Sequence, residues 1–116
     1  MEKIPYRIKH LAINNPDAQT AQALIQDLHT VFDLDITVEN DAAAMVGSIF
    51  EIMKHNRRGT VGHIALETPD VELAMNELAK KGIGFLMETA RYDENGKCIF
   101  VFLDREFGGY AIHLTT

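Results

Sequence analysis

The sequence predicts an α+β fold in which two repeated units share one curled sheet, with the helices on its outer side. Three observations support this prediction: a short motif occurs twice, each copy precedes a stretch with helical spacing of apolar residues, and each half ends in a strand of the same pattern. We expect one domain over residues 1–116, with a first module at about 7–58 and a second at about 62–116. Neither half alone is long enough to bury a sufficient core, so the two must pack together.

The repeated motif begins each half of the chain. Residues 10–17 read His-Leu-Ala-Ile-Asn-Asn-Pro-Asp, and residues 63–70 read His-Ile-Ala-Leu-Glu-Thr-Pro-Asp. Apolar residues then recur every three or four positions, which predicts a helix that packs on the sheet. We expect Asn15 and Thr68 to cap these helices, with the following proline at the first helical position. The first helix should end near Phe32-Asp33, and the second at Lys80-Lys81-Gly82.

The two halves also end alike. A glycine precedes a polar residue by four positions in the apolar stretches 47–53 and 109–115. Between them, Asn95-Gly96 is a strong signal for a hairpin turn, and a buried strand is expected over 98–103. Each unit therefore reads as a strand, a helix and then two or three antiparallel strands.

Composition excludes several classes of function. The chain has 17 acidic and 11 basic residues, a net charge of -6 and a pI near 5.2, which argues against binding to nucleic acid or to anionic membranes. No apolar run approaches the roughly 20 residues of a membrane span, and the first residues lack the apolar core of a signal peptide. The single Cys98 forms no internal disulfide, so we expect a cytoplasmic protein.

The alternation of side chains along strands brings four polar residues to one face of the sheet. If the Leu and Ile positions of each strand face the helices, the opposite face carries His10, Glu51, His63 and His113. Imidazole and carboxylate groups are ligands of divalent metals such as Zn, Ni, Fe, Mn or Co. A single histidine on a strand is more often a hydrogen-bonded wall residue, whereas three histidines and a glutamate at repeat-related positions on one face favour a site for one metal ion.

These residues give the chain a resemblance to a known family. The paired His-(Leu/Ile)-Ala starts and the Gly-x-x-x-(Glu/His) ends resemble the vicinal oxygen chelate superfamily, which includes glyoxalase I, bleomycin-resistance proteins and extradiol dioxygenases. The second half is similar to glyoxalase-like domains appended to some keto-deoxy-phosphogluconate aldolases. The resemblance implies paired βαβββ modules, a metal at the centre of the cup, and a homodimer. It places His113 where glyoxalase I has a second glutamate, and the short stretch from Asp41 to Gly47 suggests an abbreviated first sheet.

The favoured function is a metal-dependent lyase or isomerase acting on a small anionic oxo-acid or sugar-acid-like compound through an enediolate. Glu51 is the expected catalytic base. Two alternatives stay open: a non-catalytic small-ligand-binding module like the bleomycin-resistance proteins, and an Fe(II) dioxygenase.

Substrate contacts are expected outside the metal ligands. The basic stretch 54–59 is either a solvated loop or an anion-binding rim, and Tyr92 could line the cup or fill the core. The predicted substrate-binding residues are Lys54, Arg57, Arg58 and Tyr92. We also expect a homodimer that covers the sheet edges.

Overall fold

A computed structural model describes residues 3–116 of the chain. Within this range, no helix is long and apolar enough to cross a membrane. The elements follow the order strand, helix and three strands twice: β1 Arg7–Ile13, α1 Ala18–Phe32, β2 Ile36–Glu39, β3 Ala43–Val46, β4 Phe50–Met53, β5 Gly62–Glu67, α2 Val71–Ala79, β6 Phe85–Tyr92, β7 Cys98–Phe107 and β8 Tyr110–Thr115.

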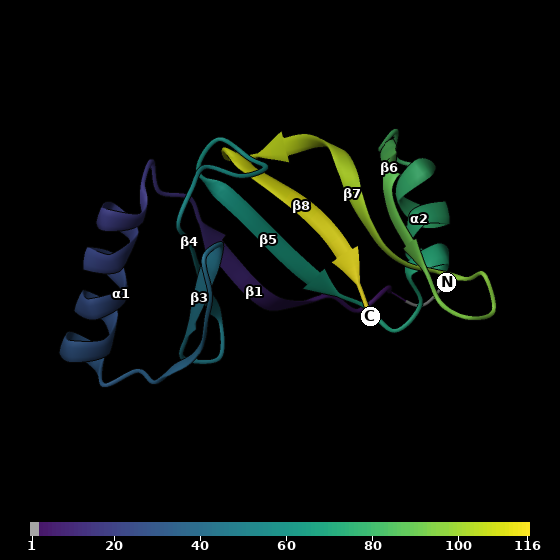
Figure 1. Cartoon of the computed structure of the whole chain (residues 1–116). Coiled ribbons are helices and arrows are strands. Elements are labelled where there is room, and N and C mark those ends of the chain that lie inside the picture. Colours follow the sequence, from purple (N-terminus) through teal and green to yellow (C-terminus); the bar gives the residue numbers. More distant parts are fainter. Residues whose placement is uncertain (1–2) are drawn as a thin grey trace.

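The strands of residues 3–116 form one open, mixed sheet in the order β2-β3-β4-β1-β5-β8-β7-β6. The halves meet where β1 runs antiparallel to β5. Inside each half the first strand lies parallel to the last, so that β1 pairs with β4 and β5 pairs with β8. Figure 1 shows the sheet curving between α1 and α2, which lie at its two ends. The α+β fold and the duplicated arrangement predicted from the sequence are confirmed.

Each helix covers the outer strands of its own half and forms a separate core. The apolar face of α1 buries Ala21 and Ile25 against Val46 of β3 and Ile52 of β4. The second core joins α2 to β7 and β8, and its buried members are Val71, Ala74, Cys98, Val101, Leu103 and Leu114. Because one face of the sheet is used for these cores, the alternating side chains on β4 and β8 project to the other face.

The helix N-caps differ from the prediction. Asp17 and Asp70 are the caps, and their carboxylates accept hydrogen bonds from the backbone N–H groups of Thr20 at 2.7 Å and Leu73 at 3.1 Å. The prediction of Asn15 and Thr68 was wrong because an aspartate two residues later reaches the third helical N–H. Each proline therefore precedes the cap rather than beginning the helix.

The ends of the helices and the long hairpin follow the prediction. α1 ends at Phe32, and α2 ends three residues before Gly82, which has a positive φ of 85°. Asn95 and Gly96 lie in the turn between β6 and β7. The first half has all three strands after its helix, each four residues long, so its sheet is abbreviated in length only.

Candidate metal centre

The four predicted ligands lie on four neighbouring strands in the middle of the sheet: Glu51 on β4, His10 on β1, His63 on β5 and His113 on β8. The pairing register puts them on one face in two rows, each with an alanine between two of the polar residues: Ala12 between Glu51 and His63, and Ala65 between His10 and His113. Ala12 of β1 lies directly opposite both Glu51 and His63. All four side chains therefore come from a single chain.

Three of the four side chains meet at contact distance. The Nε2 atoms of His10 and His63 are 3.4 Å apart. The Oε1 atom of Glu51 lies 3.5 Å from the first nitrogen and 3.2 Å from the second. These three atoms form a nearly equilateral triangle of two imidazole nitrogens and one carboxylate oxygen.

This triangle fits the ligand spacing of a divalent metal ion. With metal–ligand bonds of roughly 2.0–2.1 Å, neighbouring ligands of a tetrahedral site are roughly 3.3–3.4 Å apart. The separations of 3.2–3.5 Å lie close to that value. The chemistry also fits, because two neutral imidazoles and a carboxylate are ligands that Zn²⁺ and similar ions accept.

His113 adds a third imidazole to the cluster. Each of His10, His63 and His113 offers a ring nitrogen within 4.8 Å of the others. The His113 ring is buried and stacks on Phe100, with ring centroids 4.3 Å apart and an angle of 31° between the planes. It also meets Phe102 edge-on at 4.9 Å. These aromatic contacts fix the orientation of the ring.

Electrostatics favours the forms that bind metal. Burial lowers the pKa of His113 to about 4, and burial also lowers the pKa of His10, so both rings are neutral near pH 7. The hydrogen bond from His63 lowers the pKa of the Glu51 carboxyl and keeps it ionised. The Nδ1 atoms of His63 and His113 are buried without a hydrogen-bond partner in residues 3–116, and such atoms are costly unless a water or an ion satisfies them.

The cluster lies in a cavity of about 790 Å³. Besides the four ligand-type residues, the wall of this cavity contains four cationic side chains and two phenylalanines: Lys9, Arg57, Arg58, Arg91, Phe100 and Phe102. Among the residues that the structure describes, Glu51 is the single carboxylate of the lining. An acidic protein therefore concentrates positive charge around one cavity, which can attract an anionic molecule.

A family model identifies the family of this chain. The model of the Glyoxalase/Bleomycin resistance protein/Dioxygenase superfamily matches residues 7–114. The chain belongs to this superfamily. The match includes both halves of the sheet and all four residues of the cluster.

Individual relatives in the superfamily are methylmalonyl-CoA epimerases. The mitochondrial enzyme of Bos taurus is 24% identical over 127 residues, covering 93% of this chain and 73% of the relative. A solved epimerase of Streptomyces coelicolor in complex with 2-nitronate-propionyl-CoA has a TM-score of 0.64 and 20% identity, covering 98% of this chain and 95% of that one. The epimerase of Mycobacterium tuberculosis has a TM-score of 0.62 and 17% identity, with 93% and 85% covered. At these identities the structures establish the shared fold.

The predicted substrate-binding residues divide into two groups. Arg57 and Arg58 line the cavity of the superfamily site. Lys54 pairs instead with Glu39 of β2 at 2.9 Å, and Tyr92 lies in a separate depression beside α2. Neither Lys54 nor Tyr92 is therefore among the described residues that line the cavity.

The sequence reasoning missed Lys9 and Arg91. Lys9 is adjacent to His10, but a shift in register between β1 and β5 interrupts the alternation at this residue. Arg91 reaches the cavity because irregular pairing in β6 sets it opposite Phe100.

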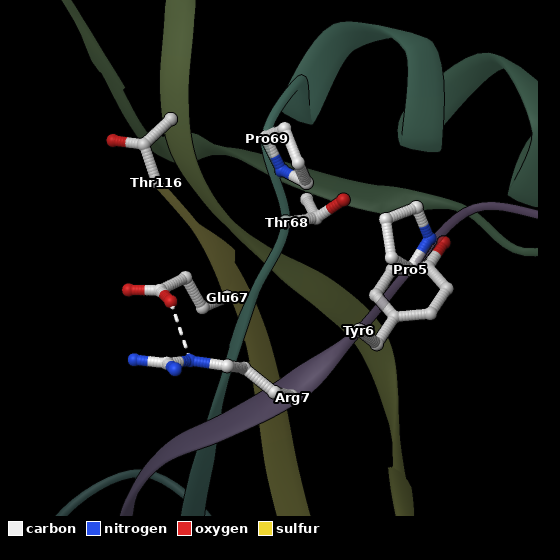
Figure 2. A pocket seen from close by; sticks show the side chains of 7 residues that line it. All are labelled: Pro5, Tyr6, Arg7, Glu67, Thr68, Pro69 and Thr116. Atoms are coloured by element: carbon white, nitrogen blue, oxygen red, sulfur yellow. Dashed lines mark ion pairs between the residues drawn. The ribbon is translucent and has the colours of Figure 1, made fainter.

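A second cavity, of about 320 Å³, lies where β1 begins and where β5 and β8 end (Figure 2). Its wall includes Pro5, Tyr6, Thr68 and Pro69, and the Arg7 guanidinium pairs with Glu67 at its margin at 2.7 Å. This cavity is mostly apolar, and the charges at its margin neutralise each other. The candidate site of this superfamily member is therefore the larger cavity, which holds the histidine and glutamate cluster.

Proposed function

We propose that this chain is a metal-dependent isomerase that removes a proton from a carbon beside a carbonyl in a small anionic acid. The observation that carries this proposal is the meeting of three imidazoles and one carboxylate on the floor of a cavity with a cationic wall. The membership of the superfamily and the epimerase relatives support an isomerase rather than a lyase.

The metal would be held by His10, Glu51, His63 and His113. Zn, Ni, Fe, Mn and Co all accept this set of nitrogen and oxygen ligands. A bound dication supplies Lewis-acid chemistry: it polarises oxygens of the substrate and stabilises the negative charge left when a proton departs.

We assign the proton transfer to Glu51. Its Oε1 atom faces His10 and His63, whereas Oε2 makes no ion pair with another side chain in residues 3–116. This second oxygen is the atom that would accept the proton and later return it. The hydrogen bond from His63 lowers the pKa of Glu51 and keeps the carboxyl ionised, which is the form that can accept a proton.

The number of bases favours a particular kind of isomerisation. Inversion at one carbon requires a proton to leave one face and return to the other, which usually takes two groups. Glu51 is the one carboxylate that lines the cavity in the described part of the chain. We therefore favour a reaction in which this carboxylate moves the proton to the neighbouring carbon on the same face.

Epimerisation of an acyl-CoA is the second candidate. It is favoured by the relatives, whose names state methylmalonyl-CoA epimerase, and by a Streptomyces coelicolor structure that holds an acyl-CoA analogue. This reaction would require one of the imidazoles or Lys9 to act on the second face. In D₂O, epimerisation places deuterium on the carbon that lost its proton, whereas transfer to the neighbouring carbon gives a product of different connectivity, and NMR distinguishes the two.

We also propose a homodimer. The edge strands β2 and β6 each have one neighbour in the sheet, which leaves a row of backbone groups to be covered. Light scattering should give a mass of about twice 13.0 kDa. A mass of one chain at all concentrations contradicts this proposal.

The test begins with metal analysis of protein purified without a chelating column. We expect one divalent ion per chain. The protein is then incubated in D₂O with short hydroxy- and oxo-acids and with methylmalonyl-CoA, and exchange at carbon is followed by NMR. Glu51→Gln should slow exchange by about 100-fold or more. This variant should still contain metal, but less than one ion per chain.

The matched control is Glu39→Gln, which changes a carboxylate of the same half that pairs with Lys54. This variant should keep both metal and exchange. A protein that contains no metal, and binds its ligands equally well after His10→Ala and His63→Ala, is a ligand-binding module instead of an enzyme.

A further inference from the structure

Two arginines of the cavity wall are stacked on the aromatic rings beside His113. The Arg58 guanidinium carbon lies 4.9 Å from the centre of the Phe102 ring, and that of Arg91 lies 4.4 Å from the centre of Phe100. The two rings touch each other edge-on, with centroids 5.7 Å apart. Both stacks therefore belong to one wall of the cavity.

Stacking leaves the hydrogen-bonding groups of each guanidinium available. A guanidinium over the face of an aromatic ring makes a cation–π contact, which does not occupy its N–H donors as an ion pair with a carboxylate would. Neither Arg58 nor Arg91 forms an ion pair with a carboxylate among residues 3–116. Two oriented cations without a protein anion are suited to an anion from solution.

Both arginines are held by the backbone around them. The loop that carries Arg58 is fixed by Asn14, whose amide donates to the carbonyls of Arg57 at 3.1 Å and Gly59 at 2.9 Å and accepts from the Arg57 N–H at 3.1 Å. Arg91 follows four residues of β6, 87–90, that stand against the single residue Val101 of β7, and this irregularity sets it opposite Phe100. Irregular pairing of this kind commonly redirects a side chain next to a site.

We propose that Arg58 and Arg91 bind a phosphomonoester group on the substrate of the neighbouring metal centre. A carboxylate offers two oxygens, which one guanidinium can occupy, whereas a phosphomonoester offers three oxygens and two charges for two guanidinium groups. One aromatic ring separates each guanidinium from His113. The phosphate therefore lies a few bonds from the oxygens at the metal, as in a short phosphorylated hydroxy acid.

This inference rests on the proposed function, because it assumes that the other end of the substrate binds the metal. The phosphate subsite can nevertheless be tested separately. The probes are 3-phosphoglycerate and glycerate, which share a hydroxy acid and differ in the phosphate. With Co²⁺-loaded protein, calorimetry should show that 3-phosphoglycerate binds at least about tenfold more tightly, as new charge-assisted hydrogen bonds imply. In the double variant Arg58→Gln/Arg91→Gln this preference should disappear while glycerate affinity stays within about twofold.

The control is the double variant Arg7→Gln/Arg105→Gln, which removes the same number of positive charges. These two arginines pair with Glu67 and Asp104 and do not line this cavity. It should keep the preference. Equal binding of the two acids by the wild type, or an equal loss in both double variants, overturns the proposal.

Two further measurements separate the possible failures. In metal-free protein, inorganic phosphate should bind more weakly to the Arg58→Gln/Arg91→Gln variant than to the wild type, so a failure of the metal chemistry leaves the subsite measurable. Displacement by coenzyme A but not by dephospho-coenzyme A would assign the arginines to a nucleotide phosphate. That result overturns the assignment to a short phosphorylated acid.

Discussion

Ala12 and Ala65 occupy equivalent places in the two halves of the sheet, each between two side chains of the histidine and glutamate cluster. Ala12 lies opposite Glu51 on one neighbouring strand and His63 on the other, and its surface is fully buried. Residues directly opposite each other have Cβ atoms about 4.5–5.5 Å apart. A methyl group between them leaves room for both longer side chains to lean toward a common centre.

Larger side chains at these two positions should therefore fill the space between the histidine and glutamate side chains. Ala12→Val or Ala65→Val is expected to lower metal affinity by about tenfold or more, because the added methyl groups occupy the space of the ligands and displace them. Overpacking should also reduce the free energy of unfolding by about 1–3 kcal/mol. Metal affinity is measured by competition with a chromogenic chelator, and stability by urea denaturation.

Ala44→Val is the control for this prediction. Ala44 is equally buried, but it packs in the core under α1 instead of facing the cluster. The control should lose stability and keep its metal affinity. If all three variants bind metal like the wild type, the alanines do not provide space for the ligands.

Much of this site could be predicted from the sequence, because strand alternation and the repeat are both local patterns. The repeat relates His10 to His63, and alternation places them on the face away from the apolar residues. Register then follows from the requirement that each half bury the same face. The separation of 3.4 Å between the two Nε2 atoms could not be predicted, since it depends on how the two halves join.

The cavity wall was harder to predict, because it depends on departures from regular pairing. Lys54 was chosen for its nearness in sequence to Glu51, but its side chain turns to the carboxylate of Glu39. Arg91 was missed because the pairing of β6 with β7 is irregular before and after it. No periodicity in the sequence indicates how many residues such a bulge contains.

Gly62 should be essential for the junction of the two halves. A Cβ atom at this position would overlap the backbone carbonyl of Ala12, so β5 can approach β1 only if this residue is glycine. We expect Gly62→Ala to lower the free energy of unfolding by about 2 kcal/mol or more, at the upper end of common single changes. Metal affinity should fall too, since His63 is the next residue.

Gly96→Ala provides the comparison for this glycine. An added Cβ there meets no atom within 4 Å, although its φ of 79° makes the change moderately unfavourable. The two variants are compared by urea denaturation. A smaller loss of stability for Gly62→Ala than for Gly96→Ala would contradict the steric explanation.

The stability of metal-free protein should depend on pH through His113. Burial lowers the pKa of this imidazole from 6.5 to about 4, so between these values the unfolded chain binds more protons than the folded chain. Stability therefore falls as the pH is lowered from about 6.5 to about 4, by roughly 3 kcal/mol for this residue. His113→Phe, which keeps a ring between Phe100 and Phe102, should remove this part of the dependence.

Urea denaturation at pH 7.5 and pH 4.5, in the presence of a chelator, measures the effect. His55→Gln changes an exposed histidine of the basic loop and should retain the wild-type dependence. An unchanged difference between the two pH values in His113→Phe would show that the fold does not hold this imidazole in its neutral form.

His113 also determines the charge of the proposed metal centre. Three neutral imidazoles and one carboxylate leave a net positive charge around a dication, whereas a second carboxylate would neutralise it. His113→Ala should lower metal affinity by about tenfold or more, because even the loss of outer contacts to a metal ligand has effects of this size. His113→Glu should keep the metal and bind inorganic phosphate more weakly than the wild type. Chelator competition and calorimetry give the two affinities. If both variants retain full metal affinity and phosphate binding, His113 is a wall residue packed between two phenylalanines, and the metal is held by His10, Glu51 and His63 alone.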